Sequence, residues 1–199
     1  MGGKITFWFE FASTYSYLSA MRIGQEAARR GIGVTWKPFL LGPVFAAQGW
    51  TTSPFNLYPA KGRYMWRDME RICAARGLPF RRPAPFPQNG LQAARLALAA
   101  AECSKTEAFA QAVYRAQFGE GADISSKAVL RGCLHSAGLD EELMQRAKTP
   151  EIKAALRAQT DAAMAAGVFG APSFTCGGEL FWGDDRLEQA LNFAAQTAI

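Results

Sequence analysis

The chain has 199 residues, of which 49% are hydrophobic, and its formal net charge is +5. This length and composition favour one folded domain over a disordered chain. The charges are scattered along the sequence without a long block of one sign. This distribution disfavours a basic surface that binds nucleic acid, and the small positive excess suits a small anionic ligand.

The chain opens with an expected β-α-β unit. Residues 5–9 are β-branched and aromatic, as is typical of a buried strand, and a helical pattern then continues to Arg30, where Gly31 ends it. Residues 34–39 have the composition of a second strand. Two such strands are expected to be parallel, with a right-handed crossover. The segment 41–60, rich in proline and glycine, is predicted to be a loop.

The middle of the chain, residues 61–167, is predicted to be helical. Met65, Met69, Ile72 and Cys73 recur at helical spacing, so they share one apolar face. Further apolar stripes, rich in alanine, follow with the same period. We attribute these stripes to core packing and not to a cofactor site.

The chain closes with an expected β-β-α unit. Residues 168–176 and 179–182 are strand-like, and the two glycines between them are typical of a hairpin turn. Asp185 and Glu188 have the spacing of a capping box, which predicts a terminal helix. The predicted fold is therefore α/β and thioredoxin-like, in a single domain (1–199) with a helical insertion at about 61–167.

The sequence carries no recognisable signal for export or membrane insertion. The first residues lack the apolar stretch and cleavage site of a signal peptide. No run of about 18 apolar residues is present that would span a bilayer. We therefore expect a cytoplasmic protein with no membrane and no nucleic acid among its partners.

The cysteines are isolated from one another: they are Cys73, Cys103, Cys133 and Cys176. None forms a C-x-x-C pair, and His135 is the only histidine. We expect reduced, mostly buried thiols, with neither a metal site nor a disulfide framework.

In a thioredoxin-like fold, the active site lies at the start of the first helix. Redox proteins of this fold carry C-x-x-C there, whereas this chain has Ser13-Thr-Tyr-Ser16. A hydroxyl cannot form a disulfide, so this position excludes dithiol exchange. A hydroxyl can donate a hydrogen bond, and the free N–H groups of a helix start favour an anion. An external thiol bound there is expected to be stabilised as its thiolate.

Four stretches together resemble one family. They are FASTYSYL (11–18), PAKGRYM (59–65), GVFGAPSF (167–174) and FWGDDRL (181–187). In this order they are similar to 2-hydroxychromene-2-carboxylate isomerase and the kappa-class glutathione transferases, which are glutathione-using relatives of the periplasmic oxidant DsbA. The resemblance covers nearly the whole chain and implies a helical insertion of the DsbA and kappa type.

The resemblance implies a glutathione site at the start of the first helix. Ser13 would hydrogen-bond the glutathione sulfur, with Thr14 and Tyr15 beside it. The backbone of Ala171 would pair with the tripeptide as an added strand, next to a cis Pro172. The full implied glutathione-binding set is Ser13, Thr14, Tyr15, Asn56, Lys61, Ala171, Pro172, Trp182, Gly183, Asp184 and Asp185.

Other implied roles concern the γ-glutamyl end of glutathione and the pocket for the second substrate. Asp184 and Asp185 match the residues that hold the γ-glutamyl end of glutathione, and Asp185 is expected to cap the terminal helix as well. Phe45 and Phe86 stand where the isomerase places a lysine and a tyrosine near its substrate, so this pocket is expected to differ. No metal is implied.

Each of these residues also has an ordinary structural explanation. Ser13 could be only an N-cap, and Asp185 only a helix cap. Pro172 could be an ordinary trans proline. Lys61 could be a solvated surface lysine, and Asn56 a turn residue. The combination of motifs, and not any one of them, favours the functional interpretation.

The resemblance implies a glutathione-dependent cis-trans isomerase. Its substrate would be an aromatic α-keto acid or the cyclic hemiketal of one, with glutathione as a cosubstrate. The enzyme would act in the catabolism of aromatic compounds and would be a homodimer. Two alternatives remain open: a kappa-like transferase or peroxidase acting on a small electrophile, and a noncatalytic module that binds glutathione or a peptide.

Overall fold

A computed structural model, which describes residues 2–197, places four strands in one sheet. The strands are β1 (Lys4–Phe9), β2 (Gly33–Pro38), β3 (Ser173–Cys176) and β4 (Glu179–Trp182). Their order across the sheet is β2-β1-β3-β4. Strands β1 and β2 are parallel, while β3 is antiparallel to both β1 and β4. The expected β-α-β and β-β-α units are therefore confirmed.

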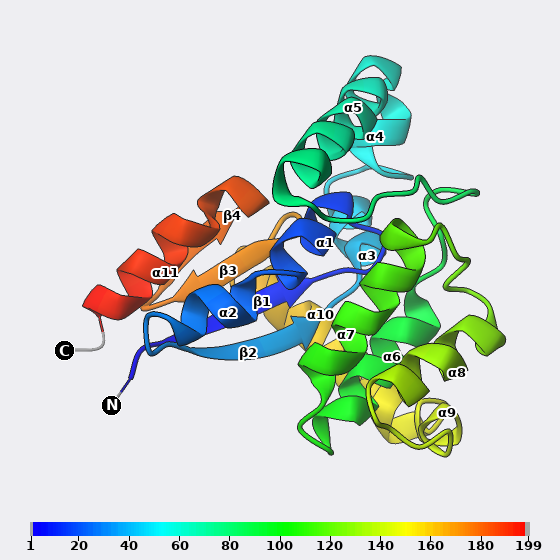
Figure 1. Ribbon diagram of the computed structural model, residues 1–199. Coiled ribbons are helices and arrows are strands. Elements are labelled where there is room, and N and C mark those ends of the chain that lie inside the picture. Colours follow the sequence, from blue (N-terminus) through cyan, green and yellow to red (C-terminus); the bar gives the residue numbers. More distant parts are fainter. Residues whose placement is uncertain (1, 198–199) are drawn as a thin grey trace.

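Helices connect and cover these strands (Figure 1). Between β1 and β2 lie α1 (Thr14–Ala20) and α2 (Ile23–Ala28). Between β2 and β3 lie α3 (Leu41–Ala47), α4 (Pro54–Leu57), α5 (Pro59–Arg76), α6 (Leu91–Ala101), α7 (Thr106–Tyr114), a π-helical turn (Arg115–Gly119), α8 (Lys127–Ser136), α9 (Leu143–Arg146) and α10 (Pro150–Ala165). After β4 come a 3-10 turn (Asp184–Arg186) and α11 (Leu187–Gln196).

The central strand β1 is buried on both of its faces. Ile5, Phe7 and Phe9 point to one face and join the main core, to which α1, α2, α6, α7 and α11 contribute. Trp8 points to the other face, where it packs in a smaller cluster that includes Ala163 of α10. The alternation follows from the two-residue period of a strand. This burial explains why the strand is apolar almost throughout.

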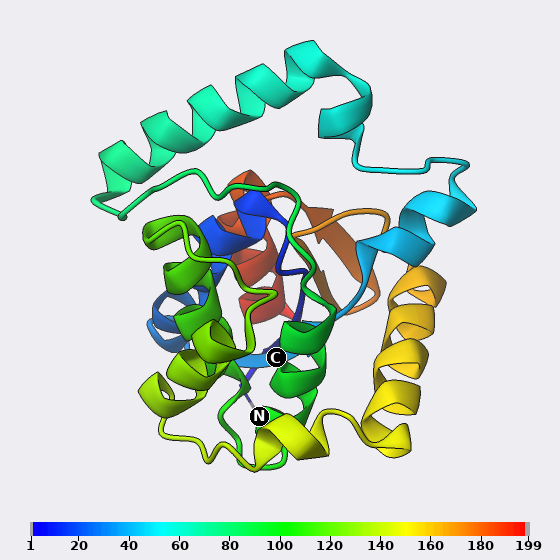
Figure 2. The ribbon, with the colours of Figure 1, turned by 90° about the vertical axis from the view of Figure 1, so that its right-hand side faces the viewer.

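Helix α5 forms the outer edge of the molecule, as an arm above the sheet (Figure 2). Its Met65, Met69 and Cys73 are at most 1% exposed, which confirms the predicted apolar face. Ile72 is half-buried and packs against the main core. This buried stripe is the face by which the arm meets the body of the molecule.

The structure corrects the predicted loop at residues 41–60, which contains two short helices. Helix α3 tolerates Pro43 because proline is allowed in a first helical turn. Helix α4 begins with Ser53, whose Oγ accepts a hydrogen bond from the N–H of Phe55, and with Pro54 in its first turn. Proline here starts a helix instead of breaking one.

Two other local predictions are also corrected. The first helix is not continuous to Arg30, because it breaks between α1 and α2 at Arg22, whose φ is −133°. The capping box is absent, because α11 begins at Leu187 and its N-cap, Arg186, makes no side-chain cap bond. The Asp185 carboxylate instead bonds the Arg186 guanidinium.

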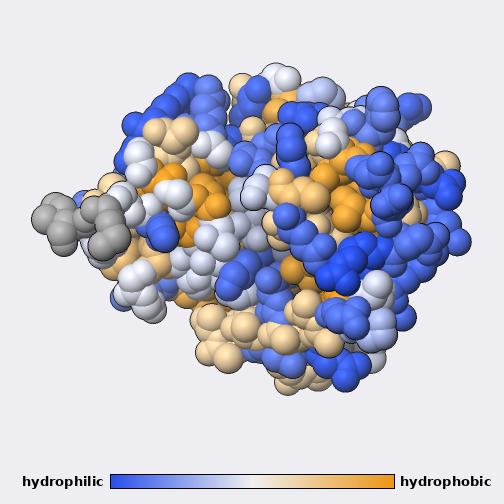
Figure 3. Space-filling view, turned by 90° about the horizontal axis from the view of Figure 1, so that it is seen from below, coloured by the Kyte–Doolittle hydropathy of each residue, from blue (hydrophilic) through white to orange (hydrophobic). Residues whose placement is uncertain are grey.

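Within residues 2–197, no helix is both long enough and apolar enough to cross a membrane. The face opposite α5 carries apolar residues in separate groups among charged ones (Figure 3). For the part of the surface seen there, this mixture is ordinary for a folded domain.

Candidate active site

A cavity of about 750 Å³ lies between the start of α1 and the arm formed by α4 and α5. Other walls come from α3, from the segment that precedes α6, and from the turn before β3. The sequence-predicted residues that line it are Ser13, Thr14, Tyr15, Phe45, Lys61, Phe86, Ala171 and Trp182. Residues far apart in the sequence are thus brought to one place.

Ser13 is both a helix cap and a wall of this cavity. Its Oγ accepts a hydrogen bond from the N–H of Ser16 at 3.2 Å, and its hydroxyl donates to the backbone oxygen of Ala171 at 2.9 Å. The Ala171–Pro172 peptide bond is cis, as predicted. Within residues 2–197, the N–H of Ala171 makes no backbone hydrogen bond. The cap interpretation is therefore correct, and it does not exclude a ligand role.

Tyr15 connects α1 to the arm. Its hydroxyl donates to Asp68 of α5 at 2.9 Å, and its ring packs near Phe55 of α4, with 6.4 Å between ring centroids. Burial raises the pKa of Tyr15, and the hydrogen bond to Asp68 raises it further. The phenol therefore stays neutral and holds the arm over the cavity.

Aromatic rings make up much of the wall. Phe45 packs on Trp50 with 5.8 Å between centroids, and Phe86 meets the edge of Trp66 at 4.7 Å. Phe169 packs on the half-exposed Trp182 at 5.0 Å. An aromatic wall with few polar groups fits a flat apolar molecule.

Trp182 lies close to the backbone of the turn before β3. A Cβ atom at Gly170 would come close enough to the Trp182 indole to clash with it. Glycine at this position therefore lets the indole ring cover the turn, next to Ala171.

Lys61 is one of three ionisable residues on the cavity wall, together with Tyr15 and Glu10. Its ammonium lies 4.9 Å from the centre of the Tyr58 ring. A cation at this position can attract an anionic group of a ligand without being buried.

Five further predicted residues lie outside the cavity lining: Asn56, Pro172, Gly183, Asp184 and Asp185. Asn56 donates its side-chain amide to Thr52 at 3.1 Å within the α4 region. The Asp185 side chain is 73% exposed and forms an ion pair with Arg186 at 3.0 Å. Its proposed contact with the γ-glutamyl end stays a prediction.

The Asp184 carboxylate is buried, and both of its oxygens have partners within the protein. It accepts hydrogen bonds from Ser19 at 2.9 Å, from Arg22 at 3.2 Å and from Arg76 at 2.7 Å. Arg22 also pairs with Glu188. These bonds join α1, the end of α5 and the start of α11, so the Asp184 side chain has a structural role, and its contact with the γ-glutamyl end stays a prediction.

Glu10 and Gln88 line the cavity and were missed by the sequence analysis. Both are nearly buried, at 8% and 5% exposure. The Gln88 side-chain oxygen accepts from the N–H of Ile124, while its amide nitrogen has no partner within the described residues. The sequence did offer a signal for Glu10, because an acidic residue within the apolar run FWFEF is expected to be buried, and buried acids without a partner are rare. No signal pointed to Gln88.

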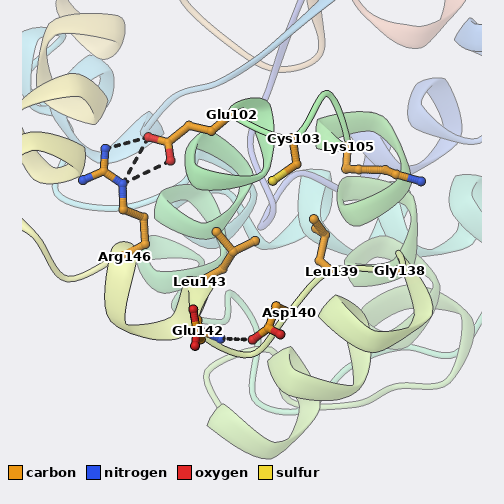
Figure 4. A pocket seen from close by; sticks show the side chains of 9 residues that line it. All are labelled: Glu102, Cys103, Lys105, Gly138, Leu139, Asp140, Glu142, Leu143 and Arg146. Atoms are coloured by element: carbon orange, nitrogen blue, oxygen red, sulfur yellow. Dashed lines mark hydrogen bonds and ion pairs between the residues drawn. The ribbon is translucent and has the colours of Figure 1, made fainter.

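A second hollow, of about 420 Å³, lies between the end of α6 and the region of α9 (Figure 4). Its Arg146 guanidinium is bound to Glu102 at 2.7 Å. Asp140 is bonded to the backbone N–H of Glu142 at 2.7 Å. These polar groups satisfy one another, so the hollow offers less to a ligand than the large cavity does.

The cysteines offer no reactive pair. Cys73, Cys133 and Cys176 are buried, Cys103 is exposed, and all are free. Burial raises the pKa of both the Cys73 and Cys133 thiols to about 11, and it also raises the pKa of Cys176. Within the described residues, no cluster of histidine, cysteine and acidic side chains is arranged to hold a metal ion.

We therefore expect no dithiol oxidase or insulin reductase activity. Ser13 and Ser16 occupy the helix start, and the buried thiols resist ionisation. An insulin turbidity assay with dithiothreitol checks this, with Cys176→Ser and Cys103→Ser assayed alongside. Activity that approaches that of a C-x-x-C protein would contradict the prediction, and the variant that abolishes it would identify the responsible thiol.

Comparison with known proteins gives consistent matches over the full chain. The DSBA-like thioredoxin domain family matches residues 4–194. A 2-hydroxychromene-2-carboxylate isomerase of Sphingobium xenophagum is 33% identical, with 94% of this chain and 96% of the relative covered. Glutathione S-transferase kappa 2 of Caenorhabditis elegans is 28% identical, with 96% of this chain and 92% of the relative covered.

Solved structures agree on the fold. A 2-hydroxychromene-2-carboxylate isomerase structure has a TM-score of 0.88 at 24% identity, covering 98% of this chain and 95% of that one. The cytosolic disulfide reductase DsbM from Pseudomonas aeruginosa, solved with GSH, has a TM-score of 0.66 at 18% identity, covering 98% and 96%. At these identities the likeness concerns the architecture alone.

Proposed function

Because the chain belongs to the DSBA-like thioredoxin domain family, we propose that it is a glutathione-dependent isomerase of an aromatic α-keto acid or its cyclic hemiketal. The observation that carries the proposal is the pairing of Ser13 with Ala171 at the edge of an aromatic cavity. Relatives named as isomerases over nearly the full chain support it.

Glutathione would lie along the turn before β3. The N–H of Ala171, which makes no backbone hydrogen bond within residues 2–197, suits an added strand of peptide, and the Ser13 hydroxyl, which donates to the Ala171 oxygen, would turn to donate to the sulfur. The backbone N–H groups at the start of α1 also favour the thiolate. Lys61 and Asp185 provide charges of opposite sign for the ends of the tripeptide.

The bound thiolate would then act as a nucleophile on the substrate. Its sulfur adds to a conjugated carbon of the substrate, so that a double bond becomes a single bond about which the chain can rotate. Elimination of the thiolate after rotation gives the other isomer and returns glutathione unconsumed. The aromatic wall around Phe45 and Phe86 would hold the substrate ring.

Ser13→Ala should lower kcat/KM for the isomerisation by about 100- to 1000-fold, as for the loss of one hydrogen-bond donor to a developing anion. The pKa of the bound glutathione thiol should return toward that of free glutathione. The measurements are an isomerisation assay and a pH titration of the thiolate ultraviolet absorption in the saturated complex.

Ser16→Ala is the matched control, since it removes a buried hydroxyl from the same helical turn but not from the cavity wall. It should change kcat/KM little. If Ser13→Ala leaves both the rate and the thiol pKa unchanged, the role of Ser13 is wrong.

A kappa-like transferase is the second candidate, which the kappa 2 relative supports. The two activities differ in what happens to glutathione. An isomerase leaves its concentration constant over many turnovers, whereas a transferase consumes one molecule per product. Product analysis with limiting glutathione separates them.

A further inference from the structure

Glu10 is a buried acid without a charged partner. It follows β1 directly, is 8% exposed, and lines the cavity that also contains Ser13. One carboxyl oxygen accepts a hydrogen bond from the N–H of Ala12 at 2.8 Å. Across residues 2–197, neither oxygen forms an ion pair with a lysine or an arginine.

The other carboxyl oxygen lies against the segment that precedes α6. A Cβ atom at Gly90 would lie 3.4 Å from this oxygen, so the absence of a side chain there leaves room beside it. Gln88, Asn89 and Gly90 all line the same cavity. The carboxyl group therefore lies in the cavity wall, and one of its oxygens has no hydrogen-bond partner among residues 2–197.

The Glu10 side chain does not make the bonds between separate elements that Asp184 makes. Asp184 is buried to a similar extent, but Ser19, Arg22 and Arg76 bind both of its oxygens. An acid buried without such partners costs free energy, which makes a functional role the better explanation.

The surroundings of Glu10 bring the pKa of its carboxyl group close to neutral pH. Burial raises the pKa of Glu10 to about 7, and the Ala12 N–H lowers it slightly. The Tyr114 phenol of α7 donates to the Glu10 backbone oxygen, and the other ionisable residues that line the same cavity are Tyr15 and Lys61. A carboxyl group in this condition can both donate and accept a proton.

We propose that Glu10 is the general acid–base of the reaction in this cavity, moving a proton between two oxygens of the hemiketal substrate. This inference rests on the proposed function. It adds a catalytic residue that the sequence motifs did not indicate.

The proton transfers balance over one ring opening. The Glu10 carboxylate takes the proton of the hemiketal hydroxyl, and that oxygen's electron pair forms the ketone. The bond from this carbon to the ring oxygen breaks, and its electron pair leaves on the phenolate. The phenolate takes the proton back from Glu10, which returns to its carboxylate. Ring closure is the reverse sequence.

Glu10→Gln tests this, because the amide oxygen can still accept from the Ala12 N–H but the side chain can no longer exchange a proton. We expect kcat to fall by about 100- to 10,000-fold, as for the loss of a general acid–base. The KM for glutathione should change little, and the limb of the kcat–pH profile near neutral pH should disappear.

Glu10→Asp is the second variant, which keeps a carboxyl group on a shorter side chain. It should lose rate but retain a titrating limb, and it tests the proposal even if the amide variant folds poorly. An acid that served only for packing would change melting temperature without changing the pH profile.

The outcomes separate this inference from the proposed function. If wild type isomerises the substrate and Glu10→Gln keeps both its kcat and its pH limb, the role of Glu10 is overturned and the function stands. If wild type does not isomerise the substrate, the proposed function is overturned and the acid–base role with it.

Discussion

Replacing Asp184 with asparagine is expected to lower the free energy of unfolding by about 2 to 4 kcal/mol. The side chain of Asp184 is 5% exposed, whereas those of Arg22 and Arg76 are 17% and 32% exposed. Removing the negative charge leaves Arg76 without its acidic partner and leaves Arg22 with Glu188 alone. Because water still reaches both arginines, the loss should stay below that of a fully buried pair. Urea unfolding monitored by tryptophan fluorescence measures it.

Asp185→Asn is the matched control for this prediction. It makes the same chemical change one residue further along, on a side chain that is 73% exposed. Its effect on stability should lie within about 0.5 kcal/mol. If both variants unfold at the same denaturant concentration, the assignment of Asp184 to the structure is wrong and its ligand role must be tested again.

Glu10 should make the protein less stable as the pH rises. Burial raises the pKa of Glu10 from its usual 4.5 to about 7 in the folded protein. Well below pH 4.5 both the folded and the unfolded chain carry the proton, so Glu10 adds no pH-dependent cost. Between pH 4.5 and 7 the unfolded chain loses the proton first, which favours unfolding. The total loss is about 3 kcal/mol by pH 8, at about 1.4 kcal/mol per pKa unit.

Glu10→Gln should lack this loss, so the difference in unfolding free energy between the variant and wild type should grow by about 3 kcal/mol from pH 4 to pH 8. Comparing the two pH values cancels any constant cost of the amide. Denaturant titrations at a series of pH values measure it. Glu70→Gln, which removes the same charge from the exposed part of α5, controls for net charge. Parallel pH curves for Glu10→Gln and wild type would contradict the burial of an unpaired acid.

Much of the fold could be predicted because its signals are local. The apolar period of α5 and the paired glycines between β3 and β4 depend on neighbours in the sequence. The segment at residues 41–60 was mispredicted because its prolines occupy first helical turns, where their missing N–H costs nothing. The break at Arg22 was missed because its partners, Asp184 and Glu188, are more than 160 residues away.

By itself the sequence determined the order of the four strands around a helical insertion, the absence of a C-x-x-C pair, and the serine at the start of α1. Only the tertiary structure decided that Asp184 binds two arginines while Asp185 faces solvent, because two adjacent aspartates look alike in a sequence. It also decided that Glu10 is buried in the wall of the aromatic cavity. Burial and charge pairing depend on contacts between distant segments, and these contacts set the cost of each ionised group.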